Sequence, residues 1–294
     1  MSEGLEGAER PPTGGDGNQR GADRVGAPTL RAGSTLRVGS VPYLVGRPLD
    51  LGLEDEPGVN LVRRPPSQLV EGLRAGDLDV ALVSSIELFR RPGYGYLNGY
   101  AVFGEGRVSS VQLFLRRPVE TLERVALDPA SRTSAALVQV LLADVHGAQP
   151  QFAEPPDGVD PRDAEADAWL RIGDRALRET FAANPPPAWN PSEAWRAHTG
   201  LPFVFALWIS APGVDLGPWR GAFERARERG RAAAPALARN AARATGLPEG
   251  ALLHYLLEEC AYEPGARLGA SLTAWRDRAA AHGLCDGDLE PIFG

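Results

Sequence analysis

Short apolar runs alternate with amphipathic segments along most of this 294-residue chain, and that alternation limits its fold more than any other feature. The runs at 36–41, 59–64 and 77–85 have the length and apolar character of buried strands. A helix is expected between the second and the third, with Ser67 as its N-cap and Gly76 at its end. This β-α-β-α-β series predicts a parallel sheet with right-handed crossovers.

The alternation starts again near residue 124 and predicts a second sheet, whereas the last part of the chain, 218–282, is helical. Helices without strands of their own must pack on a sheet that is already built, so we expect the chain to leave a first lobe and return to it. Two such crossings form a hinge with a ligand cleft between the lobes. We predict an α/β fold with a disordered tail at 1–35, a discontinuous first lobe at 36–113 and 207–294, and a second lobe at 114–206.

The composition excludes several kinds of chemistry. All 31 basic residues are arginine, which excludes a lysine Schiff base and the P-loop lysine. The two cysteines and four histidines lack metal-ligand spacing, so we expect no metal and no cofactor. A net charge of −7 argues against nucleic-acid or membrane partners and leaves a small-molecule substrate. Residues 1–35 lack the apolar core of a secretory signal, so we expect a cytoplasmic protein, its oligomeric state left open, a homodimer included.

The strongest local signal for binding is the segment LDPASRTSAALVQVLL, residues 127–142. A strand ends there, and a turn delivers Ser131, Arg132, Thr133 and Ser134 to the start of a helix. Free N–H groups at a helix N-terminus, together with hydroxyls and a guanidinium, suit a carboxylate or a phosphate. The alternative is that one hydroxyl caps the helix and the arginine is solvated. There are more hydroxyls than one cap uses, which favours anion binding.

Other polar residues follow the predicted strands, at the sheet edge where α/β proteins bind ligands. Each has a plainer alternative as a packing tyrosine in a βα turn, a helix N-cap or an inert strand serine. The histidines form no triad with a serine or cysteine motif. The further candidates for the site are Ser40, Tyr43, Arg47, Ser84, Glu87, Ser109, Ser110 and Asp174.

Six segments, taken together and in order, resemble one family. They are VGSVPYL, GDLDVALVSSIE, GRVSSV, VALDPASRTSAALVQVLL, IGDRAL and AWRAHTGLPFVFALW, and they resemble the chorismate dehydratases of the futalosine route to menaquinone. The resemblance covers about residues 36–282, and SRTS and TGLPFVFALW are its most specific parts. It implies the two-lobed periplasmic-binding-protein type II fold. It also implies the elimination of water from chorismate to give 3-[(1-carboxyvinyl)oxy]benzoate, without a metal or a cofactor.

The resemblance also implies roles for single residues. A serine of the GRVSSV segment is linked to catalysis in the family and matches Ser110, whereas the asparagine of the family's YLN pattern is Val45 here. We expect Ser110 to hydrogen-bond the departing hydroxyl or the enolpyruvyl group, and residues 131–134 to hold a substrate carboxylate. The substrate's own side-chain carboxylate is the expected base, with Glu87 as the fallback.

Two other functions stay open at this point. A non-catalytic solute-binding or ligand-sensing protein of the same fold is favoured by Val45, although neither an export signal nor a DNA-binding domain is recognisable in the sequence. The dihydroxynaphthoate synthase of the same pathway is the third reading, and the SRTS and TGLPFVFALW segments fit it less well.

Overall fold

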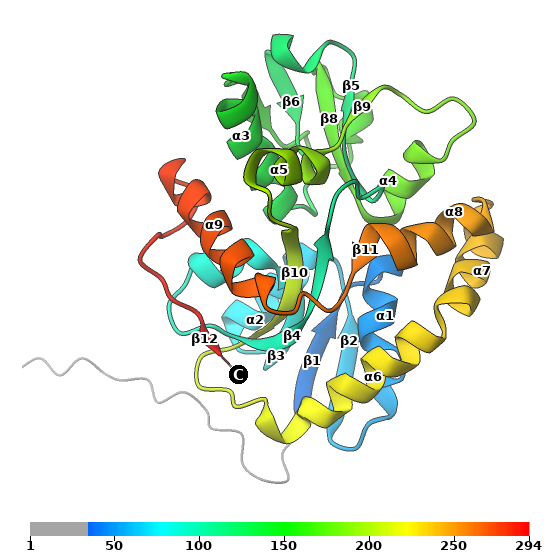
Figure 1. Ribbon diagram of the computed structural model, residues 1–294, viewed down its shortest axis with the longest axis vertical. Coiled ribbons are helices and arrows are strands. Elements are labelled where there is room, and N and C mark those ends of the chain that lie inside the picture. The colour runs from blue at the N-terminus through cyan, green and yellow to red at the C-terminus, as the bar shows by residue number, and fades with distance from the viewer. Residues whose placement is uncertain (1–34, 294) are drawn as a thin grey trace, which may run out of the picture.

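Two β-sheets form the framework of the computed structural model, which describes residues 35–293 (Figure 1). The first sheet contains β1 (Leu36–Ser40), β2 (Val59–Arg63), β3 (Val80–Ser84), β4 (Gly95–Gly104), β10 (Phe203–Ser210), β11 (Cys260–Ala261) and β12 (Ile292–Phe293). The second sheet contains β5 (Val111–Leu115), β6 (Arg124–Ala126), β7 (Gln151–Ala153), β8 (Ala168–Ile172) and β9 (Ala188–Trp189). Apart from Thr35, the tail predicted to be disordered lies outside the described residues.

The first sheet has the order β2-β1-β3-β10-β4-β11, with β12 beside β4. The predicted parallel sheet is confirmed for β1, β2 and β3. The strand β10, for which the sequence predicted no direction, runs antiparallel to both of its neighbours. The reason is the path of the chain, because β10 returns from the second sheet and therefore starts at the edge where β1 and β3 end. In the second sheet β6 is parallel to β7 and β8, whereas β5 is antiparallel to β8 and β9.

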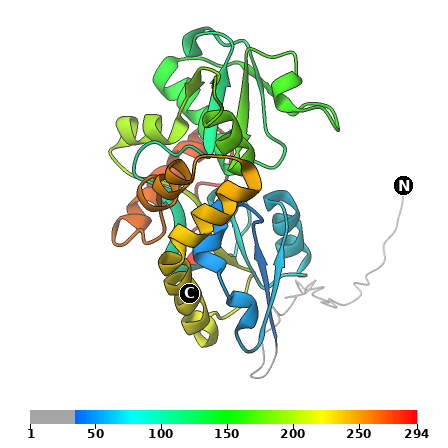
Figure 2. The ribbon, with the colours of Figure 1, turned by 90° about the vertical axis from the view of Figure 1, so that its right-hand side faces the viewer.

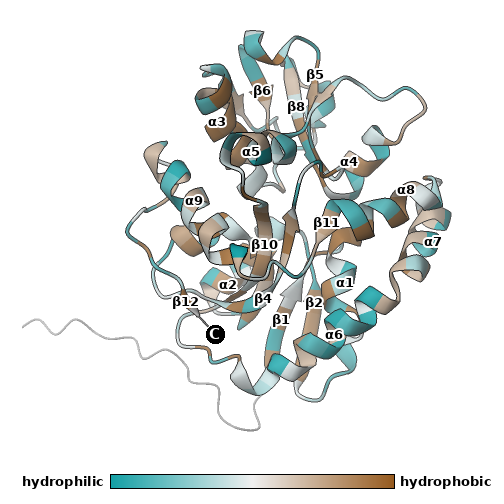
Figure 3. Cartoon of the chain, in the orientation of Figure 1, coloured by the Kyte–Doolittle hydropathy of each residue, from teal (hydrophilic) through white to brown (hydrophobic). Residues whose placement is uncertain are grey.

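Helices cover both sheets, and the C-terminal ones return to the first sheet as predicted. The helix α6 packs on α1, and α9 packs on β10. The helices are α1 (Arg47–Asp50), α2 (Pro66–Ala75), α3 (Thr133–His146), α4 (Gly173–Thr180), α5 (Pro191–Thr199), α6 (Arg220–Ala232), α7 (Ala234–Thr245), α8 (Glu249–His254) and α9 (Arg267–Ala281). Strands are mostly apolar, and the outward turns of α6 are polar (Figure 3). None of the described helices has the length and apolar character that crossing a membrane requires.

The helix α2 shows one local error of the sequence reading. It begins at Pro66 after Pro65 as N-cap residue, so Ser67 lies inside the first turn and does not cap it. Proline suits the first turn because its missing N–H would have no helical partner there. The helix ends at Gly76 in the left-handed conformation, with φ of 77°, as predicted.

The chain passes between the sheets twice, and both passages differ slightly from the predicted boundaries. The boundaries after residues 113 and 206 fall inside β5 and β10, which pair along their whole lengths with the second and the first sheet. The crossings therefore lie between β4 and β5 and between β9 and β10. Seen from the side, the second sheet with its helices stands above the first (Figure 2).

Candidate functional site

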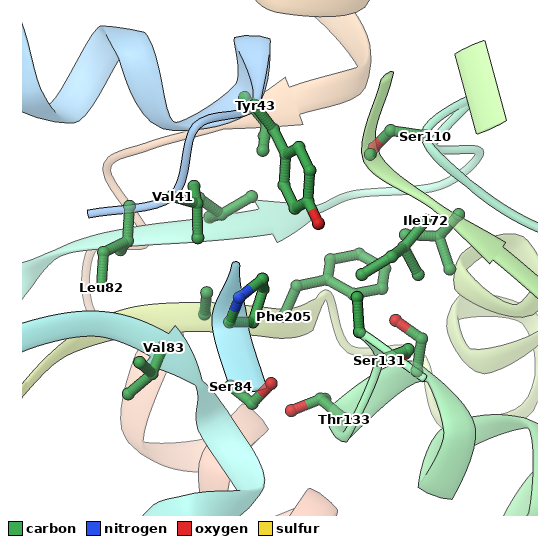
Figure 4. Close-up of a pocket in the computed structure, with 18 of the residues that line it drawn as sticks. Val41, Tyr43, Leu82, Val83, Ser84, Ser110, Ser131, Thr133, Ile172 and Phe205 are labelled. Carbon is green, nitrogen blue, oxygen red and sulfur yellow. The ribbon is translucent and has the colours of Figure 1, made fainter. Parts of the chain in front are cut away.

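A pocket lies where the two sheets face each other, and both contribute to its walls (Figure 4). Its empty volume is about 640 Å³ when the open space at its mouth is included. The apolar wall includes Val41, Val45, Leu82, Val83, Ile172 and Phe205. The polar groups are few and come from Tyr43, Ser84, Ser110, Ser131, Thr133 and Ser134. A mostly apolar lining with a few polar groups is typical of small-molecule sites, where the polar groups fix the orientation of the ligand.

The N-terminus of α3 is directed at this pocket, as the SRTS segment predicts. Arg132 is the N-cap residue, and no side chain caps the helix, so the capping alternative is wrong. The Ser131 side chain is 7% exposed and its hydroxyl has no partner among the described residues. Since the first N–H groups of a helix have no helical acceptor, amides and an unpartnered hydroxyl meet at one point. That arrangement binds anions.

Thr133 and Ser84 face each other across the pocket and connect its two walls (Figure 4). The Thr133 hydroxyl accepts a hydrogen bond from the Ile86 amide at 3.3 Å, and Ile86 follows the end of β3. The Ser85 hydroxyl, in the turn after β3, donates to the Val204 carbonyl at 2.6 Å. The end of β3 is thereby tied to α3 on one side and to β10 on the other.

Asp128 supports the turn that carries the SRTS segment, and the sequence analysis did not single it out. Its carboxylate accepts from the Ala130 amide at 3.0 Å and from the Ile172 amide at 3.3 Å. Burial raises the pKa of Asp128, although these two hydrogen bonds oppose the rise. The Asp-Pro pair at the end of the strand was the available signal, because aspartate often bonds the backbone two residues on.

Tyr43 enters the pocket from the first sheet, and its hydroxyl points toward the centre (Figure 4). Burial, together with the nearby carboxylates of Asp128 and Asp174, raises the pKa of Tyr43 to about 12. Asp174 does not line the pocket; its carboxylate accepts from the Leu44 amide at 3.0 Å and thus links α4 to the loop after β1. It lies in the first turn of α4 and does not cap that helix. Burial raises the pKa of Asp174.

Several predicted site residues lie outside the pocket. Ser40 is fully buried beside Asp50, and Arg47 forms an ion pair with that same carboxylate at 3.1 Å. Arg132 is the N-cap residue of α3, and its guanidinium is not part of the pocket wall. None of these three residues lines the pocket, so the lining gives no support to their prediction as substrate contacts.

Glu87 and Ser109 are also committed to protein partners. The Glu87 carboxylate is fully buried and pairs with Arg74 at 2.5 Å and Arg90 at 3.1 Å. Glu87 does not line the pocket, so the structure gives no support to its prediction as the fallback base. Ser109 donates from both its amide and its hydroxyl to Glu259, and it does not line the pocket.

Ser110 is the member of the serine pair that reaches the pocket. It is 4% exposed, lines the pocket, and its carbonyl accepts from the Gly173 amide at 2.8 Å. Val45 also lines the pocket, so an apolar side chain lies at the position where the family pattern has an asparagine amide. None of the described residues that line the pocket is an aspartate, a glutamate or a histidine, and no group of three metal-ligating side chains occurs between residues 35 and 293.

The fold and the pocket define a class of protein, the two-lobed binding-protein fold with a ligand site between its sheets. Protein AF1704 of Archaeoglobus fulgidus is 17% identical and superposes with a TM-score of 0.69 over 85% of this chain and 98% of that one. The aliphatic sulphonate binding protein SsuA of Escherichia coli gives 0.60 at 17% identity, over 89% and 94%. The alkanesulfonate-binding SsuA of Xanthomonas axonopodis pv. citri, bound to MOPS, gives 0.58 at 20% identity, over 86% and 94%. At these identities the likeness establishes the fold alone.

The family follows from the sequence of the whole folded part. Residues 36–281 match the family model described as menaquinone biosynthesis, and the chain belongs to this family. A chorismate dehydratase of Thermus thermophilus is 34% identical over 167 residues, an alignment that covers 51% of this chain and 61% of that protein. The aligned part thus spans less than two thirds of that relative.

The close approach of Gly173 to the Tyr43 ring can be tested by substitution. Its φ of 63° is left-handed, and a Cβ there would lie 3.0 Å from the Tyr43 ring. We expect Gly173→Ala to lower the free energy of unfolding by about 1 kcal/mol and to raise the KM of the substrate about tenfold, because Tyr43 must shift.

Gly147→Ala is the matched control, because Gly147 has a φ of 61° with nothing within 4 Å of its Cβ position. It should lose the same stability and keep its KM. Thermal unfolding and steady-state kinetics of both variants measure the difference, and equal KM values would contradict the role of the Tyr43–Gly173 contact.

Proposed function

We propose that this protein is a cytoplasmic chorismate dehydratase, a hydro-lyase that removes water from chorismate in menaquinone biosynthesis. The family and the partial match to the Thermus thermophilus enzyme support the reaction. The observation that carries the proposal is the site itself, in which the unpartnered Ser131 hydroxyl, the first turn of α3 and Ser110 line one largely apolar pocket.

The proposed roles follow from where charge develops during the reaction. The proton at C3 of chorismate is conjugated through the ring double bond to the ring carboxylate, so its removal builds negative charge on that carboxylate. The amides at the start of α3, with the hydroxyls of Ser131, Thr133 and Ser134, would stabilise this charge. They are held in place before the substrate binds, which is the condition for effective electrostatic stabilisation.

Ser110 and the substrate complete the proposed elimination. The Ser110 hydroxyl would donate a hydrogen bond to the C4 hydroxyl, which leaves as water with the proton that the substrate's own carboxylate has taken from C3. The C3 proton would go to the enolpyruvyl carboxylate of the substrate, because the pocket wall carries no carboxylate or imidazole of its own. Loss of water makes the ring aromatic, and apolar residues that include Val83 and Phe205 line the pocket that would hold it.

Turnover of chorismate by the purified protein tests the proposal. We expect an aromatic product one water lighter than chorismate, followed by ultraviolet absorbance and identified by mass spectrometry. The second candidate is a non-catalytic binding protein, which the apolar Val45 in the pocket favours. Calorimetry with chorismate under the same conditions distinguishes it from the dehydratase. Tight binding without an aromatic product would support that candidate and refute the dehydratase.

A further inference from the structure

The helical turn that precedes β11 lies behind Ser110 and belongs to a part of the chain that the sequence analysis did not connect with the site. It is a π-helix over Tyr255–Glu259, a geometry often found at functional sites. Glu259 holds the crossing segment between β4 and β5 from this side. The Ser109 amide donates to Glu259 Oε2 at 2.5 Å, and the Ser109 hydroxyl donates to Oε1 at 2.8 Å.

The same crossing segment is held from the side of the second sheet. The Thr180 hydroxyl donates to the Ser109 carbonyl at 3.1 Å, and the Gly173 amide donates to the Ser110 carbonyl at 2.8 Å. The backbone of the serine pair is thus fixed by α4 and by the π-helix together. The Ser110 side chain is the part of the pair that reaches the pocket.

Tyr255 lies next to this side chain from within the protein. It is 0% exposed, and its hydroxyl lies beside the side chains of Ser110 and Cys260 without a fully formed hydrogen bond to any described residue. Burial raises the pKa of Tyr255 well above 10 and that of Cys260 to about 12. Both groups therefore stay neutral, and the tyrosine keeps a proton that it can donate. A buried hydroxyl left without a partner costs about 1–3 kcal/mol.

We propose that Glu259 and Tyr255 are positioning residues for Ser110: Glu259 fixes the backbone through Ser109, and the Tyr255 hydroxyl donates to Ser110 Oγ. If Ser110 Oγ accepts a hydrogen bond from Tyr255, its own hydroxyl proton is free to point into the pocket, toward the departing hydroxyl of the substrate. This hydrogen bond also makes that proton a stronger hydrogen-bond donor, because consecutive hydrogen bonds polarise one another. This inference rests on the proposed function, since it assigns Ser110 the same task.

Tyr255→Phe is the first test, measured by chorismate turnover and thermal unfolding. We expect kcat to fall about tenfold with KM nearly unchanged, and the midpoint of unfolding to change little because phenylalanine keeps the packing of the buried ring. A merely structural tyrosine would give the same stability with full kcat. In a Ser110→Ala background the Tyr255→Phe change should cost nothing further, because the two residues act on one hydrogen bond.

Glu259→Gln is the second test and does not depend on the tyrosine variant folding. Glutamine keeps one acceptor oxygen for Ser109 and loses the other, so we expect a several-fold loss of kcat. Glu258→Gln is its matched control, as its side chain is exposed on the same π-helix, and it should behave as the unmodified protein. If the unmodified protein does not convert chorismate, the proposed function fails and this inference with it. If it does, and Tyr255→Phe or Glu259→Gln keeps full kcat, this inference alone is refuted.

Discussion

Replacing Ser131 by aspartate is expected to abolish measurable binding of chorismate, the largest effect on affinity that a single substitution in this pocket should have. The new carboxylate would take the amides at the start of α3 for itself, in place of the substrate. It would also repel the substrate carboxylate in a site shielded from water. Like charges brought together cost several kcal/mol, which corresponds to a rise of about a hundredfold or more in Kd.

The reason for choosing Ser131 is that its hydroxyl is buried and has no partner in the protein, so no internal hydrogen bond is lost. Isothermal titration with chorismate measures the effect. Gln149→Glu changes the net charge equally on an exposed residue of the chain and is the control for charge alone. Ser131→Ala should weaken binding by about tenfold, the value of one hydrogen bond to a charged group. An aspartate variant that binds chorismate normally would place the substrate carboxylate elsewhere.

Local patterns predicted the parts of the site that a single segment can build. The SRTS turn needs only a strand end, a helix start and its own hydroxyls, and Ser131, Thr133 and Ser134 all line the pocket. The same holds for the strands β1, β3 and β8 and for the helical C-terminal part. Each depends on the periodicity of apolar residues over a short stretch.

The errors concern groups whose partners are distant in the sequence. Ser109 and Glu259 are 150 residues apart, so nothing near the serine indicated that its hydroxyl is already used. Glu87 follows a buried strand and read as a candidate base, but Arg74 and Arg90 both neutralise it once the chain folds. The direction of β10, for which the sequence predicted nothing, likewise depends on where the chain re-enters the first sheet. Local periodicity carries no such information.

Ser110→Ala should lower kcat about a hundredfold or more while leaving KM nearly unchanged, because the removed hydroxyl acts on the departing group in the transition state. In other enzymes, removal of one preorganised hydrogen-bond donor lowers kcat by a similar factor. The backbone of residue 110 should stay in place, since its carbonyl still accepts from Gly173. Thermal unfolding would then show little change.

Ser271→Ala controls for the loss of a buried serine hydroxyl, because Ser271 is 1% exposed, has an unpartnered hydroxyl and lies in α9 outside the pocket. Its kcat should match that of the unmodified protein. The split between kcat and KM is the decisive measurement: a residue that only binds the ground state would raise KM and leave kcat alone. Full kcat in Ser110→Ala would mean that the departing hydroxyl leaves without help from this serine, and Tyr43, whose hydroxyl points into the same pocket, would then be the group to replace next.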